Sequence, residues 1–272
     1  MPFVTINGKE LFVAAGFGAQ SPSENGVTFV CIHGLGSSHA FYATLASKIA
    51  DSGNSCVLYD TYGSGQSKFK GEEQTLESMA ADVEGLIKHF KLNHSRTVLV
   101  GHSMGGMVAC KVASRLTDLG GIALLGPVHP SPALGDVFTQ RIKTVMQNGV
   151  EALADAIPNA APGSKATATQ RAFIRALILS QEPEGYASLC SVISNAKAPD
   201  YSAIQCPVLI VAGADDKTCP LSSSETILNS IGTDKSKKAI QVLDGVGHWH
   251  CIEAGDEVGD LLVGFAKSIS KQ

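Results

Sequence analysis

The chain has 272 residues, of which 44% are hydrophobic and 17% charged, and its formal net charge is -4. This apolar fraction is typical of a globular protein and excludes a largely disordered chain. No run of Lys or Arg exceeds two residues, which excludes the basic face that nucleic-acid binding requires. No apolar run approaches the ~18–20 residues that cross a bilayer, so we expect no membrane partner.

The 7 cysteines are scattered along the chain, and no C-x-x-C motif occurs. Several of them lie inside apolar runs. This usage is typical of unpaired thiols in the core of a protein from a reducing compartment. The sequence therefore predicts a cytoplasmic protein with free cysteines.

Apolar patterning along the chain predicts alternating strands and helices. Asn7-Gly8 is a hairpin turn signal between Phe3–Ile6 and Leu11–Val13. Short apolar runs bounded by turn residues then predict strands buried on both faces, as in a parallel sheet. These runs are Thr28–Ile32, Cys56–Tyr59, Thr97–Val100, Ile122–Leu125, Val208–Ala212 and Ile240–Leu243. Helical spacing lies between or after them at Ala40–Ser52, Leu76–Phe90, Met104–Leu116 and Val258–Ser268, which indicates βαβ units.

The alternation is interrupted between Pro127 and Pro207. Helical patterns occur there at Val137–Met146 and Gln170–Leu179, without a run of strand quality. We therefore expect residues 128–199 to form a helical cap over one edge of the sheet. Residues 1–127 and 200–272 are expected to form the core domain.

A candidate nucleophile follows the strand predicted at Thr97–Val100. Gly101-x-Ser103-x-Gly105 matches the nucleophile elbow, in which a serine occupies a sharp turn between a strand and a helix. Strand and helix approach closely at such a turn, so a side chain two residues before or after the serine would clash. The helix that begins at Met104 directs its first N–H groups and its positive dipole end at the site.

A glycine-rich turn, His33-Gly34-Leu35-Gly36, directly follows the strand predicted at Thr28–Ile32. Backbone N–H groups in such a turn can face a developing oxyanion, and the Leu35 and Met104 N–H groups would form a hole with two donors. The alternative is that these glycines only make a tight turn.

An acid and a base follow the last two predicted strands. Asp215 and Asp216 come just after Val208–Ala212, and His248 comes after the next strand. The carboxyl ends of parallel strands share one edge of the sheet, so these side chains should lie near Ser103. His248 would accept the serine proton, and a carboxylate would fix the imidazole tautomer and stabilise the imidazolium ion.

Together these motifs resemble the α/β-hydrolase superfamily, in its branch of esterases, lactonases and C–C hydrolases. The loop Asp60–Ser67 is similar to the family's D-x-x-G-x-G-x-S loop, which is usually structural. The family pattern G-x-x-D-x-x-x-P falls on Gly213, Asp216 and Pro220, which implies Asp216 rather than Asp215 as the triad acid. The resemblance implies an α/β-hydrolase fold, a mostly parallel, doubly wound sheet with a helical cap insertion.

The resemblance also implies acyl chemistry, because the family's dehalogenases and epoxide hydrolases use Asp where this chain has Ser103. Ser103 would attack a carbonyl, and water would release the acyl group. Leu124–Pro127 resembles the cap junction of 3-oxoadipate enol-lactonase-like proteins, so we expect a small ester or lactone as substrate. A C–C bond (β-ketone) hydrolase, a cofactor-free perhydrolase and a hydrolase-fold receptor with little turnover stay open as alternatives.

Five further residues are candidates for the substrate pocket: His39, Phe41, Tyr42, His129 and Trp249. For the first three, the alternative is that they begin a helix and pack under the insertion.

No metal or cofactor is expected. His248 is assigned to the triad and has no acid at ligand spacing directly beside it, and Lys68 replaces the third glycine of a nucleotide-binding G-x-G-x-x-G. We expect His250 at the surface or behind the triad, and the protein as a monomer or homodimer.

Overall fold

The computed structural model describes residues 2–14 and 26–270, and its centre is a parallel sheet of 6 strands in the order β4-β3-β5-β6-β7-β8. The strands are β3 (Thr28–Ile32), β4 (Ser55–Leu58), β5 (Thr97–His102), β6 (Gly121–Leu125), β7 (Val208–Gly213) and β8 (Lys238–Leu243). Every residue of strands β3, β4, β5, β6 and β7 is buried, which confirms the prediction made from the continuous apolar runs.

Strand β8 contradicts that prediction. Each of its residues is either partly buried or exposed, and Val242 is 47% exposed. The reason is its place at the edge of the sheet, where it pairs with β7 alone and is only partly covered.

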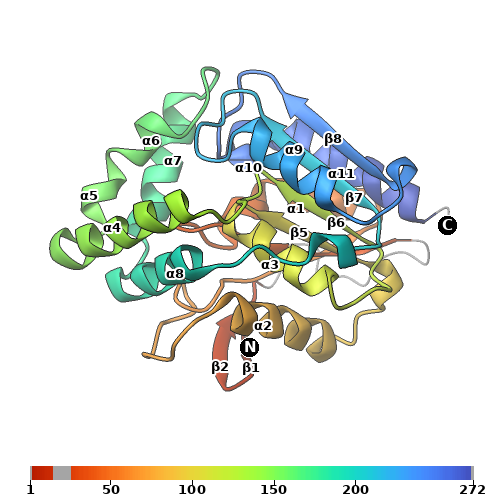
Figure 1. The fold of residues 1–272 in the computed structure, drawn as a ribbon, viewed down its shortest axis with the longest axis horizontal. Coiled ribbons are helices and arrows are strands. Elements are labelled where there is room, and N and C mark those ends of the chain that lie inside the picture. Colours follow the sequence, from red (N-terminus) through yellow and green to blue (C-terminus); the bar gives the residue numbers. More distant parts are fainter. Residues whose placement is uncertain (1, 15–25, 271–272) are drawn as a thin grey trace.

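Helices cover both faces of the sheet (Figure 1). Helix α1 packs against α11 on one face, and α2 packs against α3 on the other. This arrangement follows from right-handed crossovers, because the chain moves outward from β3 to β4 and then returns past β3 to β5. The core helices are α1 (Ala40–Asp51), α2 (Leu76–His89), α3 (Met104–Ala113), α9 (Leu221–Ser230), α10 (His250–Glu253) and α11 (Gly255–Ile269). Short 3-10 helices are η1 (His94–Arg96), η2 (Tyr201–Ala203) and η3 (Lys235–Lys237).

The predicted N-terminal hairpin is confirmed. Strands β1 (Phe3–Ile6) and β2 (Lys9–Phe12) are antiparallel, and Asn7 and Gly8 between them both have positive φ. An ion pair of 2.6 Å between Lys9 Nζ and Asp82 Oδ2 attaches the hairpin to α2.

The stretch between β6 and β7 is helical and forms a lobe beside the sheet (Figure 1). In it, α4 packs against α8, and α7 packs against α5 and α6. Its helices are α4 (Pro132–Asn148), α5 (Glu151–Ala154), α6 (Ile157–Ala160), α7 (Ala168–Leu179) and α8 (Pro183–Asn195).

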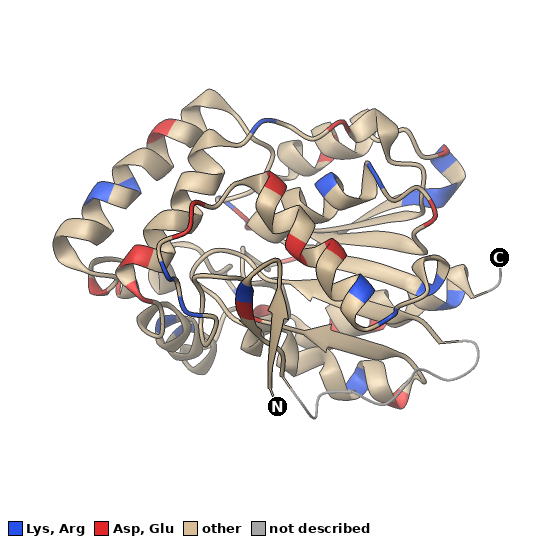
Figure 2. Cartoon of the chain, turned by 90° about the horizontal axis from the view of Figure 1, so that it is seen from below, with Lys and Arg blue, Asp and Glu red and all other residues tan. Residues whose placement is uncertain are grey.

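Charged residues of both signs are interspersed along the chain (Figure 2). All 7 cysteines are buried and none forms a disulfide, as the sequence predicts. Within the described residues, no helix combines the length and apolar character needed to cross a bilayer.

Candidate active site

Ser103 lies at the junction of β5 and α3 with φ 54° and ψ -116°, a conformation that non-glycine residues rarely adopt. A Cβ on Gly101 would overlap the Gly105 carbonyl, and a Cβ on Gly105 would overlap the Ile32 carbonyl oxygen. Both glycines are therefore required, as predicted. The Ser103 N–H donates to Leu125 O at 3.0 Å, which fixes the turn against β6.

One chain of hydrogen bonds joins the serine, histidine and acid. His248 Nε2 lies 3.0 Å from Ser103 Oγ, and His248 Nδ1 lies 2.9 Å from Asp216 Oδ2. The neighbouring Asp215 points elsewhere and accepts the Ser164 N–H at 2.8 Å. Asp216 is thus the acid in contact with the imidazole.

Asp216 is buried, and its surroundings favour the ionised form. Burial raises the pKa of this carboxyl, but the facing His248 and hydrogen bonds from the loop outweigh it and hold the pKa below its ordinary value. The N–H groups of Thr218 and Cys219 donate to Oδ1 at 2.9 and 2.8 Å, leaving Oδ2 for His248.

Two further imidazoles hold the main chain of His248. Its carbonyl oxygen lies 2.7 Å from His102 Nε2 and 3.0 Å from His250 Nδ1. A carbonyl only accepts, so both nitrogens carry hydrogen. Burial lowers the pKa of both imidazoles, that of His250 to about 4. His250 is 0% exposed and therefore lies behind the triad rather than at the surface.

These buried histidines predict acid sensitivity. The pKa of His250 falls from 6.5 in the unfolded chain to about 4 in the folded protein. Between these values the unfolded state binds more protons, so the free energy of unfolding should fall by up to about 1.4 kcal/mol per pH unit for each such group as the pH decreases. Urea unfolding at pH 7, 6 and 5 tests this. His250→Gln should show a shallower pH dependence than the wild type, and an equal dependence would contradict the assignment.

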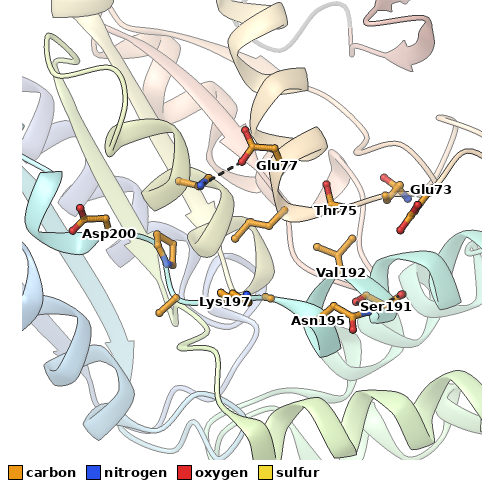
Figure 3. Close-up of a pocket in the computed structure, with 14 residues that line it drawn as sticks. Glu73, Thr75, Glu77, Ser191, Val192, Asn195, Lys197 and Asp200 are labelled. Atoms are coloured by element: carbon orange, nitrogen blue, oxygen red, sulfur yellow. Dashed lines mark hydrogen bonds and ion pairs between the residues drawn. The ribbon is translucent and has the colours of Figure 1, made fainter.

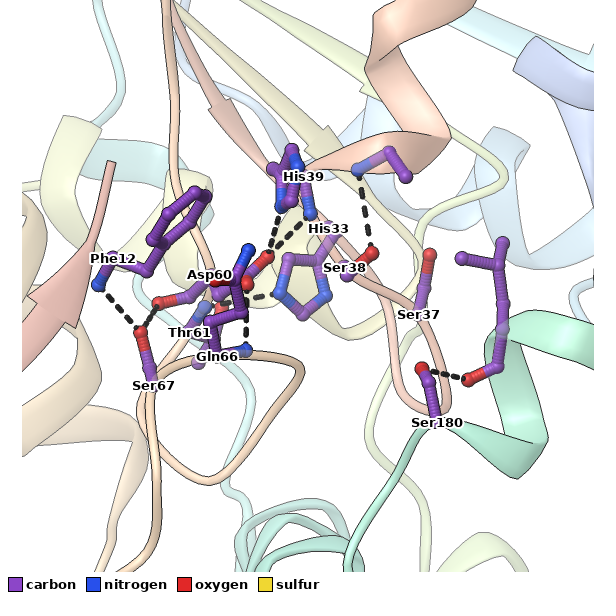
Figure 4. Close-up of polar contacts among 12 residues, drawn as sticks. Phe12, His33, Ser37, Ser38, His39, Asp60, Thr61, Gln66, Ser67 and Ser180 are labelled. Carbon is purple, nitrogen blue, oxygen red and sulfur yellow. Dashed lines mark hydrogen bonds and ion pairs between the residues drawn. The ribbon is translucent and has the colours of Figure 1, made fainter. Parts of the chain in front are cut away.

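The turn after β3 is braced by the loop Asp60–Ser67 (Figure 4). The buried Asp60 carboxylate lies 2.8 Å from His39 Nδ1 and accepts the N–H groups of His39 and Gln66 at 2.6 and 2.8 Å. His33 Nε2 accepts the Thr61 N–H at 3.0 Å. These contacts give His39 a role in holding the turn, and they do not place its ring against the triad.

The braced turn reaches the nucleophile. A Cβ on Gly34 would lie 3.0 Å from the Ser103 Cβ and 2.7 Å from His102 Nδ1. Within the described chain, the N–H groups of Leu35 and Met104 donate to no protein acceptor. Both groups are therefore free to bind a substrate oxygen.

The profile of the family described as "Serine aminopeptidase, S33" matches residues 23–254. The chain belongs to this family of α/β hydrolases. The match spans most of the core and the whole helical insertion, so the expected resemblance and the expected fold are both confirmed.

Individual relatives of this hydrolase are distant. It is similar to an enol-lactonase structure from Burkholderia xenovorans LB400, with a TM-score of 0.85, 25% identity and coverage of 98% of this chain and 100% of that one. Protein phosphatase methylesterase 1 of Candida albicans is 33% identical over 91 residues, 33% of this chain and 25% of the relative. The 3-oxoadipate enol-lactonase 2 of Acinetobacter baylyi is 23% identical over 179 residues, 64% of this chain and 66% of the relative. The chain thus spans a quarter of the methylesterase and 66% of the lactonase.

Three of the expected pocket residues pack tightly in the hydrolase. The Tyr42 hydroxyl donates to Ile32 O at 3.0 Å inside the core, which contradicts its assignment to the pocket. Phe41 is also fully buried and stacks on His102 with ring centres 4.3 Å apart, so both residues pack in the core rather than line the pocket. Trp249 is 3% exposed and lies edge-on to Phe41.

His129 does line a cavity, an open one of about 300 Å³ between the start of the insertion and the loop after β7. Cys219 lines this cavity, and the Ser103 side chain lies near enough to its thiol to lower the pKa of that thiol, against the larger effect of burial. Burial raises the pKa of this thiol well above its ordinary value, which keeps it protonated. The cavity is lined by Val128, His129, Ser131, Ala133, Leu134, Val137, Thr218, Cys219 and Ser223.

A second open cavity, of about 320 Å³, lies between the start of α2 and the end of α8 (Figure 3). Glu77 on its wall pairs with Lys111 at 3.3 Å, and no triad residue lines it. Among the residues that the structure describes, no cluster of three His, Cys, Asp or Glu side chains is arranged to hold a metal ion.

Proposed function

We propose that this protein is a serine hydrolase that cleaves a small carboxylic ester or lactone. The observation that carries the proposal is the continuous chain from Asp216 through His248 to Ser103, with contacts of 2.9 and 3.0 Å, on a strained turn. The names of its relatives, an enol-lactonase and a methylesterase among them, support the substrate class.

The proposed reaction has two halves. His248 takes the Ser103 proton as Oγ attacks the carbonyl carbon, and the N–H groups of Leu35 and Met104 stabilise the oxyanion. The imidazolium ion then protonates the leaving alcohol, and an acyl-enzyme remains on Ser103. Water activated by His248 attacks this ester and releases the acid. Asp216 holds the imidazole in the required tautomer throughout.

We propose that residues 128–199 act as a cap over a core formed by residues 1–127 and 200–272. The cavity beside Cys219 lies between these two parts and is lined by apolar side chains such as Leu134 and Val137, so it suits the acyl group of the substrate. The buried thiols, none of which forms a disulfide, favour action in the cytoplasm.

The acyl-chain preference tests this cavity. Cys219→Leu narrows it next to Ser103 and should lower kcat/KM for p-nitrophenyl hexanoate by about tenfold more than for the acetate. Cys219→Ala should leave the hexanoate reaction unchanged or faster. If kcat/KM depended on acyl-chain length in the same way in the two variants, the acyl group would bind outside this cavity.

The proposed function is tested by assaying the wild type on p-nitrophenyl acetate, simple lactones and a β-diketone. Turnover of the esters or lactones is the expected result. Preferential cleavage of the β-diketone would instead indicate a C–C hydrolase. Binding or a single acylation without release would indicate a receptor.

A further inference from the structure

One carboxylate, that of Glu253 at the end of α10, holds the main chain on both sides of His248. Its Oε2 accepts the Gly247 N–H at 2.8 Å, and its Oε1 accepts the Trp249 N–H at 2.8 Å. Hydrogen bonds from N–H groups to a carboxylate are stronger than bonds between neutral groups. Glu253 therefore fixes the peptide units that flank the imidazole.

The same carboxylate reaches the helical insertion. Oε2 also accepts the Gly163 N–H at 2.7 Å, from the segment between α6 and α7. Two residues earlier in that segment, Ala161 O accepts the His248 N–H at 3.0 Å. The N–H groups of residues 247, 248 and 249 are thus all satisfied by Glu253 or by the insertion.

The two segments also fit closely. A Cβ on Gly163 would lie 2.6 Å from Gly247 N, so the backbones are in contact there. At the rim, Lys165 Nζ lies 2.8 Å from Asp244 Oδ2. The segment 161–165 is therefore fastened to the loop that carries His248, and it is poorly placed to open as a lid.

We propose that Glu253 is a positioning residue that couples the insertion to His248. This inference rests on the proposed function, because it assigns the coupling to proton transfer at Ser103. The carboxylate does not touch the imidazole ring. It acts through the peptide units on either side, so its loss should affect the chemical step more than substrate binding.

The kinetic test compares Glu253→Ala, Glu253→Gln and the control Glu257→Ala, whose side chain is exposed on α11. Misplacement of a catalytic group by about 1 Å costs up to ~10²-fold in rate. We expect Glu253→Ala to lower kcat for p-nitrophenyl acetate by 10- to 100-fold, as an order of magnitude, with KM within about threefold. Glu253→Gln keeps one acceptor oxygen and should recover part of kcat, and Glu257→Ala should match the wild type. An unchanged kcat in Glu253→Ala would overturn the proposal.

Amide hydrogen exchange tests the coupling without relying on turnover. In Glu253→Ala, peptides covering residues 158–166 and 244–250 should lose protection together, while the rest of the chain matches the wild type. Loss of exchange protection in only one of the two segments would overturn the proposed coupling. Wild-type protein that shows both protected segments but hydrolyses no ester would refute the proposed function and leave the hydrogen-bonded tie intact.

Discussion

Replacing Ser103 with alanine is expected to lower kcat for ester hydrolysis by about 10⁶-fold, as for other triad nucleophiles. Without Oγ there is no acyl-enzyme, and only the oxyanion donors and substrate binding remain. Steady-state assays with p-nitrophenyl acetate measure the effect. A loss of less than tenfold would reject Ser103 as the nucleophile.

A second variant separates loss of the nucleophile from loss of the fold. Ser103 has φ 54°, where alanine remains strained and glycine does not. Ser103→Gly should therefore be as inactive as Ser103→Ala, but its melting temperature should equal or exceed that of Ser103→Ala. An inactive Ser103→Gly with a raised melting temperature would show that the elbow holds strain for catalysis rather than for stability.

Replacing Asp216 with asparagine should lower kcat by about 10⁴-fold while leaving the fold intact. The amide has nearly the shape of the carboxylate but cannot stabilise the imidazolium ion, and it permits the wrong tautomer of His248. The matched control is Asp215→Asn, because Asp215 is adjacent and, among the described residues, accepts hydrogen bonds only from Ser164 in the insertion. We expect the control to stay within about threefold of the wild type. Equal losses in the two variants would contradict the choice of Asp216.

The fold was predictable where buried elements produce a recognisable pattern of apolar residues in the sequence. Strands buried on both faces are continuous apolar runs, and β3 begins and ends at the predicted residues. Helix α9 lacks such a pattern, because its sequence LSSSETILNS is mostly polar and buries only Ser224 and Ile227. Helix α8 begins at Pro183 and is not among the helices predicted from the sequence, although proline is favoured in the first turn of a helix.

The proximity of Ser103, Asp216 and His248 was predictable because each residue lies in a turn or loop that follows a strand, so its position depends on local chain order and sheet topology. The surroundings depend on packing between distant segments. Tyr42 follows the expected turn, yet its rotation within α1 aims the hydroxyl at β3. Cys219 had a local signal, since it lies three residues after Asp216. The contact of Glu253 with the insertion had none, because it reaches Gly163 across 90 residues of sequence.

The proposed acyl-enzyme is tested most directly by intact-mass analysis of the protein during turnover of p-nitrophenyl acetate, followed by peptide mapping. We expect a transient mass increase of one acetyl group, located on Ser103 and absent from Ser103→Ala. Rapid ester hydrolysis without that adduct, or with the acetyl group on another residue, would contradict an acyl-enzyme at Ser103.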